Sequence, residues 1–159
     1  MGRTSYAIAL GSNRRSSRHG SPAANLRAAV TALGKLGEIG ALSPILATPA
    51  LGPAGRAFAN AAVLVTTDLA PDALLAQLKA IERSFGRRPG RRWGPRVLDL
   101  DIILWSQGPW RSRGLTLPHP QMLKRRFVMD PLVAIAPQWR VPPSCRSVRQ
   151  LARRRSRSC

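Results

Sequence analysis

Asp99 and Asp101 are the two side chains best suited to chemistry, because they alternate with apolar residues in the run VLDLDIILW. An extended strand places alternate side chains on opposite faces, so both carboxylates share a face with Ile103. At about 3.3 Å per residue their Cα atoms lie about 6.6 Å apart, close enough to reach shared cations. This spacing suggests a two-metal site, although the acids could instead pair with arginines on a solvated face. The other face is expected to be core and comprises Leu98, Leu100, Ile102 and Leu104.

A loop dense in arginine, Arg87 to Arg96, comes directly before these aspartates. Arginine presents a fixed fork of donors that matches phosphate oxygens. The sequence has no GxxxxGK[ST] phosphate loop, which argues against a P-loop nucleotide enzyme. Phosphates would then be held by metal at the two carboxylates and by arginine side chains. That combination is typical of phosphoryl or nucleotidyl transfer, in which catalysis is largely positioning and neutralisation of charge.

Composition narrows the class of protein without naming a partner. The 159 residues are 44% hydrophobic, enough for one domain with its own core. The formal charge of +19 is compatible with nucleic acid, an acidic membrane surface or a polyanionic small ligand. The sequence has no secretory signal and no apolar run of roughly 18 to 20 residues, so we expect a soluble, cytoplasmic protein that does not contact a membrane. Cys145 and Cys159 indicate neither a disulfide framework nor a zinc site.

The order of expected elements predicts an α+β fold with a mostly antiparallel sheet covered by helices. Strands are expected at residues 6–10, 41–48, 61–67 and 99–105, the second interrupted by Pro44. One helix should begin at Pro22, with Ser21 as its N-cap, and run to Gly37. A second helix should begin at Pro71 and end at Gly86.

Three residues near these elements have open roles. Phe58 and Asn60 alternate at the entrance of the third strand and could stack on and read a flat heterocycle, or be a core and a turn residue. Glu82 borders the buried face of the second helix, so its carboxylate needs partners from the arginine loop or from a ligand.

The last third of the chain is predicted to be less regular. His119 stands between two prolines on an extended loop and is either structural or a phosphate donor. A short strand is expected at residues 128–129, followed by a brief helix from Asp130-Pro131 to Ala136. Residues 144–159 are rich in arginine and serine and are predicted to be a mobile or loosely docked tail.

Six segments, in this order and spacing, resemble the 6-hydroxymethyl-7,8-dihydropterin pyrophosphokinases of folate biosynthesis over residues 6–142. They are Ala9-Leu10-Gly11-Ser12-Asn13, Thr48-Pro49 with Leu51-Gly52-Pro53, Phe58-Ala59-Asn60-Ala61-Ala62-Val63, Arg92-Trp93-Gly94-Pro95-Arg96, Leu98-Asp99-Leu100-Asp101 and Leu117-Pro118-His119-Pro120.

The resemblance implies a ferredoxin-like α/β sandwich over residues 1–143, with residues 144–159 as a basic tail. It also implies transfer of pyrophosphate from ATP to the pterin hydroxymethyl group, with release of AMP. The cofactors would be two Mg²⁺ ions with ATP as co-substrate. The partners would be ATP and the pterin alone, without nucleic acid, for a monomeric enzyme.

The resemblance also assigns residues. The expected catalytic residues are Arg87, Arg96, Asp99 and Asp101, of which the two aspartates hold the metal. The expected pterin site comprises Thr48, Pro49, Leu51, Phe58, Asn60, Trp93 and Phe127. The expected ATP site comprises Glu82, Arg87, Arg96, Ile102, Thr116, His119 and Arg125.

The chain departs from the family pattern at Pro89, where the family often has a second arginine that Arg88 or Arg91 could replace. Two other functions fit the residues alone: a two-metal nucleotidyltransferase and an arginine-rich nucleic-acid-binding module.

Overall fold

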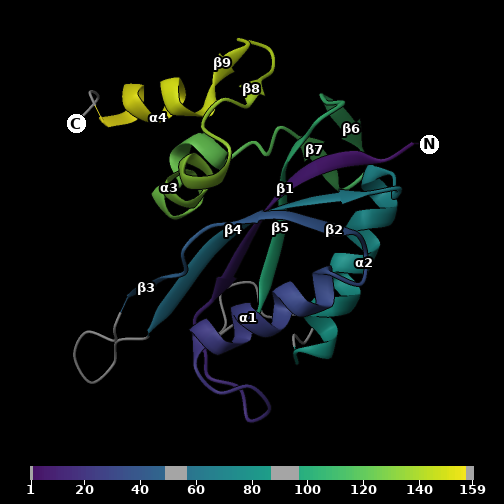
Figure 1. Ribbon diagram of the computed structural model, residues 1–159, viewed down its shortest axis with the longest axis vertical. Coiled ribbons are helices and arrows are strands. Elements are labelled where there is room, and N and C mark those ends of the chain that lie inside the picture. The colour runs from purple at the N-terminus through teal and green to yellow at the C-terminus, as the bar shows by residue number, and fades with distance from the viewer. Residues whose placement is uncertain (1, 49–56, 87–96, 157–159) are drawn as a thin grey trace.

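The computed structural model describes residues 2–48, 57–86 and 97–156 (Figure 1). Its central sheet has the strand order β2, β4, β1, β5, with β3 also paired to β4. The strands are β1 (Thr4–Ser12), β2 (Glu38–Leu42), β3 (Leu46–Thr48), β4 (Phe58–Thr67) and β5 (Asp99–Trp105). All of these pairings are antiparallel, which confirms the predicted α+β class and sheet.

Helices lie on both sides of this sheet (Figure 1). α1 (Pro22–Leu33) and α2 (Pro71–Ser84) pack on one face, and α3 (Arg126–Ile135) packs on the other with α4 (Val148–Ser156) against it. The smaller elements are β6 (Trp110–Ser112), β7 (Leu115–Leu117), η1 (Met122–Lys124), β8 (Arg140–Val141) and β9 (Arg146–Ser147). In the described part of the chain, no helix has the length and apolar character needed to cross a membrane.

The central strand β1 is apolar because both of its faces are buried. Tyr6, Ile8 and Leu10 belong to the core beneath α1 and α2. Ala7 and Ala9 point to the other face and belong to the core formed with α3. The small alanines leave room above the sheet, which forms part of a pocket beside the first turn of α3.

The predicted faces of β5 are correct up to Ile103 and wrong at Leu104. Ile8 pairs with Ile102 but Ala7 pairs with Leu104, so the strand carries one extra residue at Ile103. A bulge of this kind reverses the alternation that follows it. Leu104 therefore packs beside Ile103 under α3, and Trp105 takes the place in the other core that was predicted for Leu104.

α1 starts as predicted but ends earlier. The Ser21 hydroxyl accepts a hydrogen bond from the Ala24 N–H at 3.2 Å, as an N-cap does. After Leu33 the bonds tighten to the i−3 pattern, and the chain turns toward β2 instead of continuing to Gly37. Gly37 instead allows close approach to β4, because a Cβ there would overlap the carbonyl oxygen of Thr66.

The sheet edge follows the sequence prediction with shifted bounds. The predicted strand at residues 41–48 is divided into β2 and β3, with Pro44 in the break between them. β2 begins at Glu38, three residues earlier than expected, and β4 begins at Phe58 instead of residue 61. Pairing to β4 extends β2, and pairing to β1 and β3 extends β4, beyond the stretch that their own β-branched residues indicate.

Two predictions for the last third of the chain are wrong. Residues 128–129 are not a strand: α3 begins at Arg126 and carries Pro131 in its interior. Val128, Met129 and Leu132 have helical spacing and are buried in one cluster. The free energy gained by burying them outweighs the loss of the backbone hydrogen bond that Pro131 cannot donate. The connection before His119 is also more regular than predicted, because β7 pairs with β6.

The described part of the predicted tail is ordered and packed. Arg146 and Ser147 form β9, which pairs with β8, and α4 follows. Val148 is fully buried in the core cluster that includes α3. The prediction of a loosely docked end is therefore wrong up to Ser156. The few apolar residues of this segment are enough to dock it, because they share one face of a helix. The domain boundary at 143/144 stays a prediction.

The close approach at Gly37 predicts a stability difference between two glycines. Gly37→Ala should lower the free energy of unfolding by about 1–3 kcal/mol, because the new methyl group meets the backbone of β4. Gly34→Ala is the matched control: Gly34 has helical φ of −61° and no contact under 3.4 Å, so the change should stabilise by up to about 1 kcal/mol. Urea unfolding monitored by circular dichroism measures both, and equal midpoints would contradict the packing at Gly37.

Candidate active site

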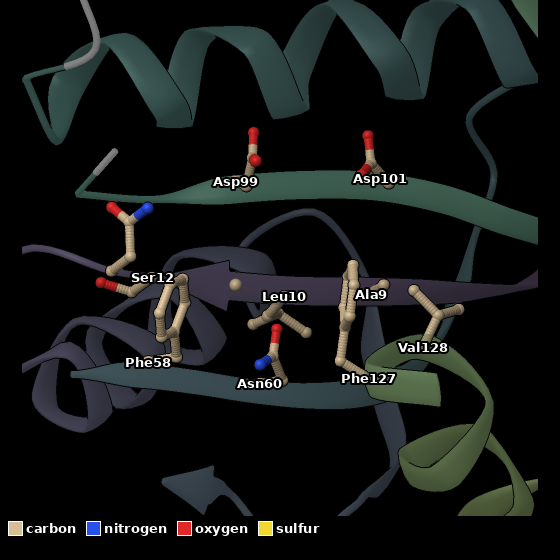
Figure 2. A pocket seen from close by; sticks show the side chains of 11 residues that line it. Ala9, Leu10, Ser12, Phe58, Asn60, Asp99, Asp101, Phe127 and Val128 are labelled. Carbon is tan, nitrogen blue, oxygen red and sulfur yellow. The ribbon is translucent and has the colours of Figure 1, made fainter. Parts of the chain in front are cut away.

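A pocket of about 390 Å³ opens where α3 stops covering its face of the sheet. Nearer β6, this face is apolar and lies beneath α3, with Leu64, Ile103 and Leu104. Further along the same strands the apolar side chains give way to Asn60, Asp99 and Asp101, which line the pocket (Figure 2). Its other lining residues are Ala9, Leu10, Gly11, Ser12, Asn13, Phe58, Phe127 and Val128.

The pairing of three strands brings the polar residues together. Gly11 on β1 stands opposite Asn60 on β4 and opposite Asp99 on β5. Ala9 stands opposite Asp101 in the same way. Adjacent strands lie about 4.8 Å apart, so the Asn60 carboxamide and the Asp99 carboxylate flank a position that has no side chain. Gly11 therefore forms an open floor between them.

Two aromatic rings form opposite walls of the pocket. Phe58 and Phe127 are 45% and 51% exposed, unusually high fractions for side chains of this kind. Figure 2 shows the two rings standing apart, with Asn60 between them. The exposure excludes the alternative in which Phe58 is a core residue. Two exposed rings with a gap between them are suited to stacking on a flat heterocycle.

The two aspartates fit a cation that is shared with a ligand. Both line the pocket from one strand, and carboxylate oxygens are the donors that Mg²⁺ prefers. Within the described ranges, no group of three or more His, Cys, Asp or Glu residues is placed to hold a metal. Magnesium typically uses one or two carboxylates and completes its coordination with water and substrate phosphates. The donor set fits that mode and not an all-protein cage.

His119 and Arg125 are not among the residues that line the pocket, but His119 lies close enough to Asp101 and to Arg125 for both charges to act on it. The backbone N–H of His119 donates to the Ile103 carbonyl at 2.9 Å. The Nδ1 atom of the His119 ring accepts a hydrogen bond from the Gln121 N–H at 3.1 Å. Burial lowers the pKa of His119; the Asp101 carboxylate opposes this and Arg125 adds to it. A neutral ring that accepts at Nδ1 carries its proton on Nε2, which is then a donor.

Arg125 also approaches the aromatic wall. Its guanidinium carbon lies 5.9 Å from the centre of the Phe127 ring. Arg125 has an extended backbone and precedes the first residue of α3, so the start of this helix sets the place of both side chains. One short segment thus places a cation beside a ring that forms a wall of the pocket.

Comparison with known proteins bears on which of the possible chemistries applies. The model of the 7,8-dihydro-6-hydroxymethylpterin-pyrophosphokinase (HPPK) family matches residues 7–137. The chain belongs to this family. The resemblance found in its motifs is confirmed, and an HPPK enzyme replaces the nucleic-acid-binding module as the interpretation of its arginines.

Similar curated proteins carry the corresponding name. The 2-amino-4-hydroxy-6-hydroxymethyldihydropteridine pyrophosphokinase of Pseudomonas aeruginosa is 41% identical over 138 residues, covering 85% of this chain and 82% of that protein. The enzyme of the same name from Synechocystis is 40% identical over 129 residues, covering 80% and 66%. The mitochondrial folate synthesis bifunctional protein of Pisum sativum is 49% identical over 76 residues, covering 48% of this chain and 15% of its own.

A solved structure agrees on the fold. The wild-type HPPK-DHPS of Plasmodium falciparum with pteroate superposes with a TM-score of 0.71, covering 96% of this chain and 42% of that one. At 12% identity this likeness shows the fold alone. It confirms the α/β sandwich that the motifs implied.

The ATP-site candidates that the structure describes, His119 and Arg125 included, lie outside the pocket lining of this HPPK family member. Glu82 is buried and accepts a hydrogen bond from the Leu100 N–H at 2.9 Å. The Ile102 side chain is buried in the core under α2, so only its backbone could meet a ligand. Thr116 lies in β7, half-buried. The sequence predicted partners for Glu82 in the arginine loop or in a ligand. The backbone N–H of Leu100 is a further partner that was not predicted.

Several predicted residues lie outside what the structure describes. Thr48 ends β3 opposite Phe58 by register, but its side chain is not described. The others are in the undescribed ranges 49–56 and 87–96, and they are Pro49, Leu51, Arg87, Trp93 and Arg96.

The segment Ala9 to Asn13 and Val128 line the pocket but were not assigned to it from the sequence. Ala9 to Asn13 was recognised as a family motif, and its place beside Asn60 and Asp99 depends on strand pairing that no local pattern reveals.

The open floor predicts the effect of adding one methyl group. In Gly11→Ala the Cβ would lie 3.3 Å from the Asn60 Oδ1, the mobile end of a side chain. The carboxamide should move, changing the side-chain NH₂ signals of Asn60 in ¹H–¹⁵N spectra, while the free energy of unfolding changes by less than about 1 kcal/mol. Gly40→Ala on β2 has contacts of 3.8 Å or more and should leave those signals in place. Unchanged Asn60 signals in Gly11→Ala would contradict this floor.

Proposed function

We propose that the pocket between Phe58 and Phe127 is where this pyrophosphokinase binds its pterin. The family reaction is transfer of pyrophosphate from ATP to the hydroxymethyl group of 6-hydroxymethyl-7,8-dihydropterin, in folate biosynthesis. The hydroxyl oxygen forms a bond to the β-phosphorus, and the bond from that phosphorus to the oxygen bridging to the α-phosphorus breaks. AMP leaves with the bridging oxygen, and the hydroxyl proton is released.

The observation that carries this proposal is the placement of a ring-binding wall beside a pair of acids in one pocket. The pterin ring would lie between the two phenylalanines, each of which offers a face for stacking. Asn60 would pair with the polar edge of the ring, because a carboxamide supplies both an acceptor and donors. Asp99 lies across Gly11 from Asn60, so a substituent on the bound ring would extend toward the acids.

The phosphate side of the site is proposed to begin at the acids. Asp99 and Asp101 would hold the two magnesium ions, which neutralise phosphate charge and act as Lewis acids when bound. His119 Nε2–H and the Arg125 guanidinium are donors on the side of Asp101 and would bind phosphate oxygens. Both could orient ATP without changing protonation, since the pKa of His119 is lowered by burial.

Other assignments remain proposals on the strength of the family motifs. Arg87 and Arg96 would neutralise phosphate charge, and Trp93, Thr48, Pro49 and Leu51 would complete the pterin site. Ile102 and Thr116 would lie near the nucleoside. The expected monomeric state and cytoplasmic location are also predictions.

The reaction is tested by the nucleotide product. Protein mixed with Mg²⁺, ATP and reduced hydroxymethylpterin should form AMP, and Asp101→Asn should lower kcat by about 10²- to 10³-fold because a charge that faces the transferred group is lost. Asp130→Asn, an exposed acid on α3, is the control and should retain full activity. ADP as product, or pyrophosphate release with transfer of AMP, would overturn the assignment; the latter would indicate a nucleotidyltransferase.

The aromatic wall predicts a separation of binding from stability. Phe127→Ala should raise the Kd for the pterin by about tenfold or more, because one stacking surface worth about 1–3 kcal/mol is removed. The urea midpoint should hardly change, since half of this side chain is already exposed. Leu123→Ala is the matched control, since Leu123 is similarly exposed, at 45%, but is not part of the pocket lining, and this variant should bind normally. Isothermal titration with the pterin measures both, and equal affinities would place the ring elsewhere.

A further inference from the structure

The carboxylate of Glu82 is the one buried charged group among residues whose burial the structure describes. Only 4% of the residue is exposed, at the last turn of α2. Burial of a carboxylate costs free energy unless hydrogen bonds compensate for the lost water. One such bond is the 2.9 Å contact from the Leu100 N–H to Glu82 Oε2. The location of this contact indicates a role for the buried charge.

Leu100 lies between Asp99 and Asp101 on the outermost strand of the sheet. Among the strands of the described ranges, β5 pairs only with β1, which lies on one side of it. In an antiparallel pair alternate residues direct their N–H groups away from the partner strand. The Leu100 N–H points away from β1 to the outer edge, where it donates to the Glu82 carboxylate.

A second contact holds the same edge beyond Asp101. The backbone N–H of His119 donates to the Ile103 carbonyl at 2.9 Å. The outer edge of β5 is therefore bound at Leu100 by a helix side chain and at Ile103 by a loop. Asp101 lies between the two points. An edge strand held in this way keeps a fixed course, and the carboxylates it carries keep a fixed spacing.

We propose that Glu82 is a positioning residue, whose carboxylate binds the Leu100 amide and so fixes the geometry with which Asp99 and Asp101 hold metal. This role replaces the direct ATP contact predicted from the sequence, and it rests on the proposed function of the two aspartates. It requires an acceptor oxygen at residue 82 and does not require a negative charge. Groups that orient metal ligands typically change metal affinity by 10- to 100-fold when they are removed.

The test compares Glu82→Gln, which keeps an acceptor, with Glu82→Ala, which does not; Lys79→Ala on the exposed side of α2 is the control. Mn²⁺ binding in the presence of a nonhydrolysable ATP analogue is followed by electron paramagnetic resonance. Glu82→Ala should bind Mn²⁺ about tenfold more weakly or worse, while Glu82→Gln and the control stay within about twofold of the wild type. Exchange of the Leu100 amide hydrogen should accelerate at least about tenfold in Glu82→Ala only.

Kinetics separate positioning from ATP contact. In Glu82→Ala, raising the Mg²⁺ concentration should restore kcat toward that of Glu82→Gln, and the KM for ATP at saturating Mg²⁺ should match the wild type. The proposal is overturned if both variants raise the KM for ATP equally while Mn²⁺ binding and Leu100 exchange are unchanged, since that result assigns Glu82 to ATP.

Two measurements keep the test decisive if Glu82→Ala does not fold. Rapid exchange of the Leu100 amide in the wild type, or a tenfold loss of Mn²⁺ affinity in Glu82→Gln, would each overturn the proposal. Slow exchange together with normal Mn²⁺ binding in Glu82→Gln would support it. These readouts need no turnover, so they are independent of the AMP assay: absence of AMP from the wild type contradicts the proposed function, whereas unchanged metal binding in Glu82→Ala contradicts the role of Glu82.

Discussion

The pairing register of β1 between β4 and β5 is the constraint on which the site depends. It sets Gly11 opposite both Asn60 and Asp99, so that residues from distant parts of the chain share one row of the sheet. If β5 slipped by one residue relative to β1, both aspartates would turn into the core beneath α1 and α2, and leucines would be exposed in their place. Leu98, Leu100 and Ile102 resist such a slip of β5, because their side chains would leave the core in which they are buried. The apolar core thus defines the geometry of the polar site.

The same face of the sheet serves two purposes along its length. Under α3 it is apolar and closed, and beyond Phe127 it is polar and open. The bulge at Ile103 lies in the closed half, so it changes the packing of Leu104 and Trp105 without disturbing the two aspartates. α3 itself is supported from behind by α4, whose Val148 is fully buried. Residues near the end of the chain therefore help to hold the helix that places one wall of the pocket.

Arginine content alone would have misled an interpretation of this chain. A charge of +19 resembles that of a nucleic-acid-binding protein, yet family membership identifies a small-molecule enzyme. The informative arginine in the described site is Arg125, because it lies beside Phe127 and acts on His119. Family membership, and not the total number of cations, distinguishes the two classes of protein here.

The sequence by itself determined the class of fold, the family and the strand that carries the acids. Alternation over Asp99 to Ile102 needs only the period of an extended chain, and the motifs occur in a specific order. Local patterns failed where tertiary contacts dominate: α3 includes Pro131 because its apolar face is buried, and residues 146–156 are ordered because Val148 has a core to enter. The location of Gly11, the gap between the two phenylalanines and the backbone partner of Glu82 were decided by tertiary structure only. Each joins residues far apart in the chain, and their spacing depends on strand register and helix packing that no short stretch of sequence encodes.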